Sequence, residues 1–515
     1  MGVNNISIIN SAYSALEAAS AGMTVTSQNV AGASVDGFTR RQSNSIVSHR
    51  ALNSWDFGNT AFSVEGFTRF TDGLLDSQIR DQKSKSSYTA SLLQTVNGLD
   101  TAMMDPANSI AEAMSSFFNA AGTLASNTSS TTNIQNFAAS ATQAATRIST
   151  FTDTLKDLDS STRTNLTAIL EQANAIAPAL AKINLNILMG SVPGNATPSA
   201  DILDERDRLT LQLQDLLGGN TIINSDGTAT FQVGGMALVD GQTANQFVNT
   251  DVSTSIYNVQ LQSGDGLKQN IGYLTTEGAT LTTTTGGTYK APAKTAFTSG
   301  QAGAAITILT DFIPDVKRQV SAIALAFARD VNNVKQKDGS TGITAIFGYK
   351  NTSTTGPSII TTIPSVLGTY TADQLMNMAD PTSSLYNEQI ATVVNGASWD
   401  PTLFVSNITA GTNTVLNIDA TAANAIEGKR TNFSTPLSLM TSYVASTISS
   451  WKSQDKANIS VAKQLDDRKQ SISGVNLDEE AANLVKFQQL YGAASKVMQT
   501  ANQMFATLLA AMNAA

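Results

Sequence analysis

The C-terminal segment carries a large apolar side chain at every seventh position, and those from Leu484 to Phe505 are each followed three residues later by a second apolar residue of the same stripe. Alternating steps of three and four keep these positions on one face of an α-helix, which is the pattern of helices that pair along a seam. The sequence therefore predicts a long helix with a helical partner. The large positions are Leu477, Leu484, Tyr491, Met498, Phe505 and Met512, and the second set is Phe487, Ala494, Ala501 and Leu508.

The N-terminal segment has the same spacing. Ile9, Leu16, Met23 and Val30 stand at seven-residue steps, and the smaller Ala12, Ala19 and Thr26 follow the first three of them. Because both ends share one periodicity, we expect them to pair as a coiled coil. The predicted self-assembly seam consists of Ile9, Leu16, Met23, Val30, Leu477, Leu484, Phe487, Tyr491, Met498, Phe505 and Leu508.

The start of the C-terminal helix carries a capping signature. Asn476 is a favoured N-cap residue, and Glu479 stands three residues later, which is the spacing of a capping box. The neighbouring acids Asp478 and Glu480 also suit the positive end of a helix dipole. We interpret this acidic run as helix-start chemistry rather than as catalytic carboxylates.

Both terminal segments are nearly free of charged side chains. Residues 1–35 contain only Glu17, and nothing after Lys496 is charged. A coiled coil surrounded by water normally carries Glu and Lys beside its seam, where they keep the pair soluble and select the partner. The missing charge favours a helix pair that is surrounded by copies of itself. The alternative is an internal hairpin that closes the two ends of a monomer, because heptads do not identify the partner.

Helical periodicity fills residues 71–219 and returns over 303–338 and 432–470. We expect these segments to form one helical layer, in which Pro178 kinks or ends a helix. The run DERDR at 204–208 carries both signs of charge. We interpret it as ion pairs on a solvated helix face rather than as a metal cluster.

Short alternating runs between glycines and threonines occupy 220–302 and 339–431, and they predict two β-rich outer insertions. The expected fold class is α+β and multidomain, with a discontinuous, layered architecture. In this scheme residues 1–48 and 471–515 form an inner coiled-coil polymerisation domain, residues 49–70 are a linker, and the helical segments and the insertions follow outward.

The pattern VDGFTR at 35–40 returns as VEGFTR at 64–69, without similarity on either side. This argues against a duplicated module. Gly37 directly follows the N-terminal seam, and we expect it to let the backbone turn out of the inner helix. Gly66 is expected to bend a strand at the entrance to the helical layer. The two glycines are thus predicted hinges at the ends of the linker.

The composition excludes several classes of function. The net charge is −9 and the pI about 4.8, which disfavours nucleic acid or an anionic membrane as partner. There is no cysteine and one histidine, His49, which we interpret as a solvated loop residue. No catalytic site, metal site or cofactor is expected. The chain start lacks the charged and apolar regions of a signal peptide, and no apolar run reaches the roughly 18–20 residues of a membrane helix.

Two stretches of the chain resemble a known family. SGVNLDEEAANLVKFQQLYGAASKVMQTANQMFATLL at 473–509 resembles the C-terminal signature of the bacterial flagellar rod, hook and hook-associated proteins, and SQNVAGASVDGFTRRQ at 27–42 resembles their N-terminal signature. Within that family, QSISGVNLDEE, DILDERDRLTLQLQDLLG and the chain length fit the member that joins the hook to the filament.

The resemblance implies a structural subunit, not an enzyme, whose terminal helices build the inner tube of an axial filament. It also implies copies of the chain, the hook protein and the next junction protein as partners, with an export chaperone at the C-terminal helix. The expected location is the extracellular flagellum, reached through the flagellar export apparatus without a cleaved signal peptide.

Two alternatives stay open. One is another axial subunit, either the hook protein or the third hook-associated protein. The other is an adhesin or enzyme with a coiled-coil stalk, for which acids such as Asp311, Asp315 and Asp373 offer no spacing suggestive of a site.

Overall fold

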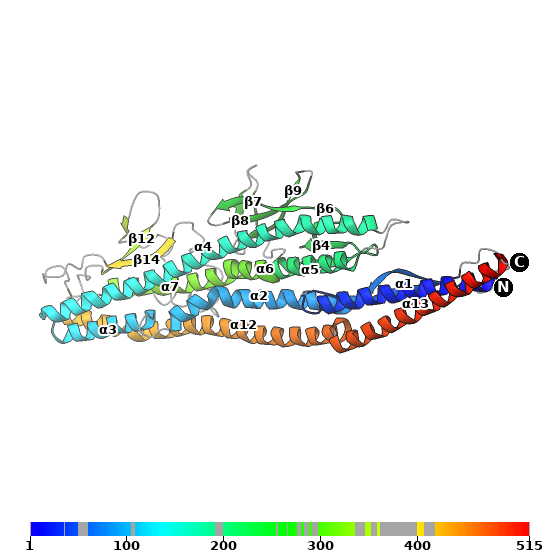
Figure 1. The fold of residues 1–515 in the computed structure, drawn as a ribbon. Helices are drawn as coiled ribbons and strands as arrows, with labels where there is room; N and C mark the ends of the chain where they lie inside the picture. The colour runs from blue at the N-terminus through cyan, green and yellow to red at the C-terminus, as the bar shows by residue number, and fades with distance from the viewer. Residues whose placement is uncertain are drawn as a thin grey trace.

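The chain starts at one tip of an elongated molecule, runs to the opposite end and returns to the same tip (Figure 1). This computed structural model describes residues 2–35, 37–49, 60–104, 109–190, 199–253, 256–264, 266–274, 280–282, 288–290, 297–334, 346–351, 358–360, 399–405 and 418–513. Its fold is α+β, mostly helical with small antiparallel sheets.

The helices account for most of the described residues. None of them, within the described ranges, combines the length and hydropathy that a bilayer span requires. Their bounds are α1 (Gly2–Gly32), α2 (Gly73–Met104), α3 (Ile110–Ser126), α4 (Thr131–Gly190), α5 (Ala200–Leu217), α6 (Gly300–Thr307), the π-helical η2 (Ile308–Phe312), α7 (Ile313–Asn332), α11 (Ala420–Glu427), α12 (Arg430–Ser473) and α13 (Leu477–Asn513).

The long helices α2, α4 and α12 run along the molecule, with α5, α6 and α7 between α4 and the lower pair (Figure 1). Helix α5 ends at Gly218, whose φ of 74° requires a residue without a Cβ. There the backbone passes so close to Ser299 that a side chain on Gly218 would collide with it. Helix α4 continues through Pro178, so of the two expected effects, a kink or an end, the end does not occur. Packing of α4 against α5, α6 and the sheets stabilises the helix despite Pro178, which has no backbone N–H to donate.

Aromatic packing closes the end of the body farthest from the chain termini. Phe327 lies 4.9 Å from Phe347 and 5.3 Å from Phe117, measured between ring centroids. Phe118 and Phe433 join the same cluster at 5.9 and 5.7 Å from Phe327. These residues are fully buried, and they tie α3, α7, α12 and β12 into one core.

The strands form small antiparallel sheets, most of them on the side of α4 that faces away from α2 and α12 (Figure 1). Four strands are ordered β3-β4-β5-β6, three are ordered β7-β8-β9, three are ordered β13-β12-β14, and β10 pairs with β11. Their bounds are β3 (Asn220–Ile223), β4 (Ala229–Val233), β5 (Met236–Asp240), β6 (Thr243–Ala244), β7 (Gln246–Ser253), β8 (Ile256–Gln262), β9 (Lys268–Leu274), β10 (Thr280–Thr282), β11 (Thr288–Lys290), β12 (Phe347–Asn351), β13 (Ser358–Ile360) and β14 (Trp399–Val405).

Asparagine side chains attach helices to strands by forming the pair of backbone hydrogen bonds that a neighbouring strand would otherwise form. The fully buried Asn184 of α4 accepts from the Ala229 N–H at 2.9 Å and donates to the Ala229 carbonyl at 2.8 Å. One side-chain amide thereby satisfies both backbone groups of a residue. The same reciprocal contact recurs between Asn29 and Arg41, between Asn174 and Phe247, and between Asn332 and Phe347.

Residues 41–49 and 60–69 pair as the two strands of a β-hairpin. Strand β1 (Arg41–His49) pairs antiparallel with β2 (Thr60–Arg69), so the segment expected to be a linker over 49–70 contains a strand. The backbone of His49 belongs to β1 opposite Thr60, and its assignment to a loop was therefore wrong. The polar sequence RQSNSIVSH lacks the regular alternation of apolar and polar residues that predicts a strand.

Candidate assembly surface and the joint at its base

Helices α1 and α13 lie side by side at the tip that holds both chain ends (Figure 1), and we call them the terminal pair. Small side chains make their contact. Ala12, Ala19 and Ala494 are buried, and Ala501 is fully buried. A Cβ on Gly22 would overlap the ring of Phe487, so the aromatic ring lies directly on the α1 backbone. The small residues therefore let the two helices approach closely.

Apart from Phe487, the large residues of the predicted seam lie at the edges of this contact rather than at its centre. Because small residues occupy the centre, the bulky ones keep part of their surface exposed toward solvent. Half-buried are Ile9, Leu16, Met23, Leu484, Phe487 and Met498, whereas Val30, Leu477, Tyr491 and Phe505 are exposed and the side chain of Leu508 lies outside the described set.

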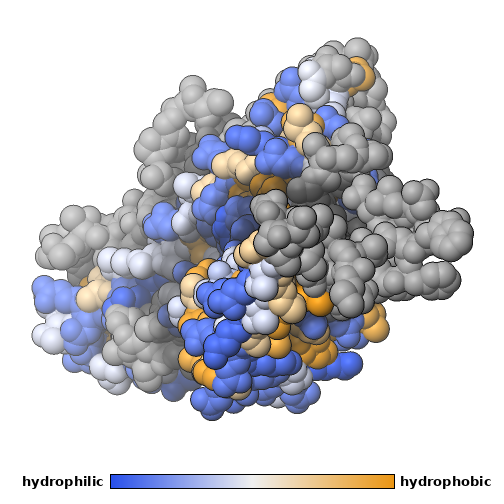
Figure 2. Space-filling view, turned by 45° about the vertical axis from the view of Figure 1, so that its right-hand side comes forward, coloured by the Kyte–Doolittle hydropathy of each residue, from blue (hydrophilic) through white to orange (hydrophobic). Residues whose placement is uncertain are grey.

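The terminal pair therefore presents an apolar surface with few charges. Tyr13 is 64% exposed on α1, and Leu490, Val497 and Leu509 are 44–48% exposed on α13. Figure 2 turns this tip toward the viewer and shows apolar patches between the polar side chains. Exposed apolar residues that follow two adjacent helices are typical of a protein interaction surface.

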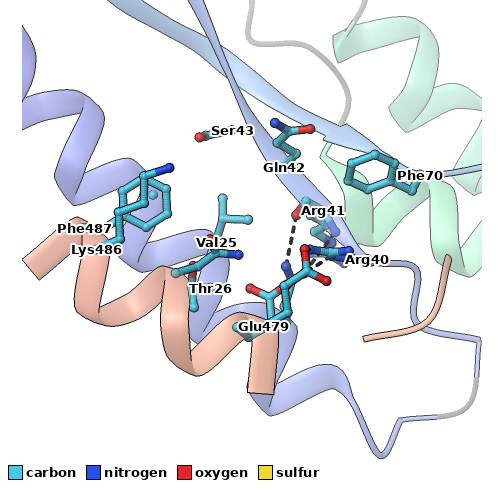
Figure 3. Close-up of a pocket in the computed structure, with 14 residues that line it drawn as sticks. Val25, Thr26, Arg40, Arg41, Gln42, Ser43, Phe70, Glu479, Lys486 and Phe487 are labelled. Atoms are coloured by element: carbon cyan, nitrogen blue, oxygen red, sulfur yellow. Dashed lines mark hydrogen bonds and ion pairs between the residues drawn. The ribbon is translucent and has the colours of Figure 1, made fainter. Parts of the chain in front are cut away.

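At the base of the terminal pair, α1, the hairpin, α5 and the turn between α12 and α13 meet. We call this place the joint; it comprises Asn29, Arg40, Arg41, Arg69, Phe70, Asp201, Asp204, Asp207, Ser473, Glu479 and Glu480. Its cavity of about 320 Å³ is lined by residues of α1, β1 and α13 (Figure 3).

Arg40 joins the hairpin side of the joint to α13. Its Nη2 donates to Glu479 at 2.8 Å, and its Nε donates to the buried Glu480 at 3.0 Å. The hydrogen bond to Glu479, together with the charge of Glu480, raises the pKa of the Arg40 guanidinium. The guanidinium also lies over the ring of Phe70, 5.5 Å from its centroid.

Asn476 caps α13, since its Oδ1 accepts the N–H of Asp478 at 3.0 Å and that of Glu479 at 3.4 Å. The Glu479 carboxylate binds Arg40 instead of reaching back to the cap, so the expected capping box is wrong. An ion pair with a neighbouring guanidinium is the stronger interaction for that carboxylate.

At the joint, backbone hydrogen bonds connect three segments that are far apart in the sequence. The Arg40 N–H donates to the Ser473 carbonyl at 3.1 Å, and the Phe70 N–H donates to the Arg40 carbonyl at 3.0 Å. The Ser473 hydroxyl completes the set by donating to the Phe70 carbonyl at 2.7 Å. These bonds fix the place where the terminal pair leaves the helical body.

Arg41 anchors the hairpin to α5. Its Nη2 donates to Asp201 at 2.6 Å and to Asp204 at 2.9 Å, while its guanidinium lies 4.7 Å from the centroid of the Phe38 ring. Burial lowers the pKa of Arg41, but the hydrogen bonds to the two carboxylates outweigh it, and the pKa is raised. Arg69 adds a second guanidinium from β2, 3.0 Å from Asp204.

The DERDR run thus belongs largely to the joint, and its interpretation as a solvated face is wrong except for one pair. Asp204 and Asp207 bind the hairpin arginines, and Arg206 is buried. Only Glu205 and Arg208 form a half-exposed pair along the helix. Within the described ranges, no three His, Cys, Asp or Glu side chains gather as metal ligands.

The two predicted hinge glycines have different surroundings. Gly37 has a φ of 81° with open space around it, in the turn that follows α1. Gly66 lies inside β2 opposite Asn44, beside the register shift at which Ser45 pairs with Val64. A β-bulge at such a shift kinks a strand locally, and the role of Gly66 as a hinge stays a prediction.

Two of the remaining candidate acids lie in the described part of the chain. Asp311 lies on η2, and Asp315 accepts the hydroxyl of Tyr443 at 2.9 Å. Asp373 lies outside the described residues.

Comparison with known protein families gives two matches. Residues 96–344 match the helical domain of the flagellar hook-associated protein FlgK, and residues 469–511 match the C-terminal region of the flagellar basal body rod FlgEFG proteins. The second match covers the start and most of the length of α13.

Curated relatives are similar over nearly the whole chain. The flagellar hook-associated protein 1 of Salmonella typhimurium is 25% identical, covering 98% of this chain and 99% of the relative. The protein of the same name from Escherichia coli K12 is also 25% identical with the same coverage, and that of Bacillus subtilis is 22% identical over 95% of each chain. A solved FlgK from Burkholderia pseudomallei, titled a flagellar hook junction protein, aligns with a TM-score of 0.43 at 20% identity over 53% of this chain and 47% of that one.

Proposed function

Since the chain belongs to the flagellar hook-associated protein 1 family and is a structural subunit of the bacterial flagellum rather than an enzyme, we propose that it joins the hook to the filament through its terminal pair. The observation that carries this proposal is the exposed, nearly uncharged apolar surface of α1 and α13. In this role the seam residues contact neighbouring copies and flagellar partners.

Burial of that surface supplies the driving force. Apolar area removed from water stabilises a contact by about 25 cal/mol per Å². Tyr491 and Phe505 are each more than 40% exposed, and so they have area left to bury in an assembly. In this role the terminal pair forms an inner coiled-coil layer, the body helices form the next layer and the β-rich segments form the outer one.

The joint suits a subunit that transmits force. Ion pairs and backbone bonds connect α13, the hairpin and α5 at one point, so the terminal pair and the body are held in a defined relation. The resemblance of the C-terminal segment further supports a chaperone bound at α13 before export through the flagellar apparatus.

Charged substitutions on the exposed seam test the junction role. Tyr491→Asp with Phe505→Asp is introduced into a strain that lacks its own copy of this chain, and the matched control is Leu267→Asp, an exposed apolar residue of the β8–β9 turn. We expect hooks without filaments for the seam variant and normal filaments for the control. Normal filaments with the seam variant would reject the junction role, and absent hooks would indicate the hook protein.

A further inference from the structure

Two charged side chains stand out on the distal part of the terminal pair. Glu17 is the only charged side chain of α1, and Lys496 is the only one of α13 beyond Phe487. Both side chains are exposed. This half of the surface thus holds one acid and one base among apolar and uncharged polar residues.

These two charges do not neutralise each other within the chain. In the described part of the structure, neither Glu17 nor Lys496 has an ion-pair partner, although pairs are present at the joint nearby. Each charge is therefore available to another molecule.

The two residues lie at neighbouring levels of the terminal pair. Helices α1 and α13 run in opposite directions (Figure 1), with Gly22 against Phe487. Five residues from that contact, Glu17 stands at the level of Gly492, and Lys496 lies four residues farther along α13. At 1.5 Å per residue, the two levels differ by about 6 Å, or roughly one helical turn.

Packing copies of this surface together would remove both charges from water. A charge that loses its hydration without gaining a partner is strongly unfavourable, whereas an opposite charge with good geometry offsets that cost. Charged pairs beside a helical seam also select the partner and fix its register. The single acid and single base are complementary in sign and near in level.

We propose that Glu17 of one copy forms an ion pair with Lys496 of a second copy, and that this pair sets the axial register of the lateral contact. The inference rests on the proposed function, because it needs terminal pairs that assemble side by side. It adds a specific contact that an apolar surface alone does not define.

Charge reversal tests the pair in the full-length chain in cells. Glu17→Lys is compared with Glu17→Lys combined with Lys496→Glu, and Lys463→Glu on the exposed face of α12 is the control. The readout is the amount of chain in isolated hooks and filaments. We expect about a tenfold loss for the single reversal, recovery to within about twofold for the double reversal, and no change for the control, since like charges across an interface are strongly unfavourable.

The other outcomes overturn the proposal. Normal incorporation of Glu17→Lys would show that Glu17 lies in solvent in the assembly. Failure of the double reversal would show that the partner of Glu17 is a residue other than Lys496. Recovery of incorporation when Glu17→Lys is combined with Lys486→Glu would show the same. Unchanged helix content of the purified Glu17→Lys chain separates misfolding from lost assembly. Because the seam variant Tyr491→Asp with Phe505→Asp tests assembly independently, the charge pair can fail while the junction role stands.

The absence of cysteine allows a direct structural test. In the variant Glu17→Cys with Lys496→Cys, oxidation of isolated flagella is expected to link copies into dimers and higher multimers. The single-cysteine variants should give no higher multimers than dimers. If flagella that have incorporated the double variant show no linked multimers after oxidation, the proposed contact is contradicted.

Discussion

The Arg40 guanidinium binds the Glu480 carboxylate at 3.0 Å, although 440 residues separate them in the chain. Glu480 is 2% exposed, so this carboxylate depends on its cation for solvation. The same arginine holds Glu479, which is largely exposed. One side chain therefore connects the outgoing and the returning segments at the base of the terminal pair.

Removal of this cation should loosen the joint. In Arg40→Ala, Glu480 keeps its burial without a partner, and we expect a local loss of about 3 kcal/mol, at the lower end of the range for broken buried pairs because Arg40 itself is partly exposed. Hydrogen exchange of the residue 40 amide, which donates to Ser473, measures the opening. Glu479→Ala is the control, with an expected loss below about 1 kcal/mol. Equal effects of the two substitutions would refute the assignment.

Two glycines of the terminal pair should respond in opposite directions to alanine. Gly492→Ala meets open space and should stabilise α13 by up to about 1 kcal/mol through helix propensity. Gly22→Ala instead collides with the Phe487 ring, and overpacking of this kind costs about 1–3 kcal/mol. Hydrogen exchange across α1 and α13 distinguishes them. Slower exchange in Gly22→Ala than in the parent chain would show that Phe487 does not rest on α1, and Gly22→Ala with Phe487→Leu should recover part of the loss.

The asparagine contacts predict a large effect from one polar core residue. Asn184→Leu leaves the Ala229 N–H and C=O without their partner, and each orphaned buried group costs about 1–3 kcal/mol. The matched control is Asn186→Leu, two residues away on the same helix and half-buried. Urea unfolding monitored by circular dichroism should show a lower midpoint for Asn184→Leu only. Equal midpoints would mean that water replaces the amide.

Periodicity predicted much of the helical framework, because each helix leaves a local repeat of apolar residues. It also predicted that α13 begins after Asn476, since a cap is local chemistry. It did not show which positions within the stripe lie at the centre of the helix contact. A heptad identifies two positions per repeat, and only contact with the partner showed that Ala19 and Ala494 occupy the centre.

The joint was not predictable for a different reason. Arg40, Asp204 and Glu480 each have an ordinary local interpretation, as a turn residue, a helix surface charge and a helix-start acid. Their actual partners are more than a hundred residues away, and sequence spacing says nothing about such pairs. Burial was the missing information, because Glu480 is indistinguishable from the exposed Glu479 until the fold encloses it.

Acid should weaken the turn between β3 and β4. Asp226 accepts the Thr228 hydroxyl at 2.7 Å and the Thr228 N–H at 2.9 Å, and these hydrogen bonds lower the pKa of Asp226 below 3.8. A lowered folded-state pKa means that the stabilisation is present above the unfolded value and disappears as pH falls through the folded one. A carbon-13 NMR titration of the aspartate carboxyls measures this. In Thr228→Val the hydroxyl is lost and the backbone donor stays, so the pKa of Asp226 should move part of the way back toward 3.8. An unchanged titration would show that the hydroxyl does not stabilise the carboxylate.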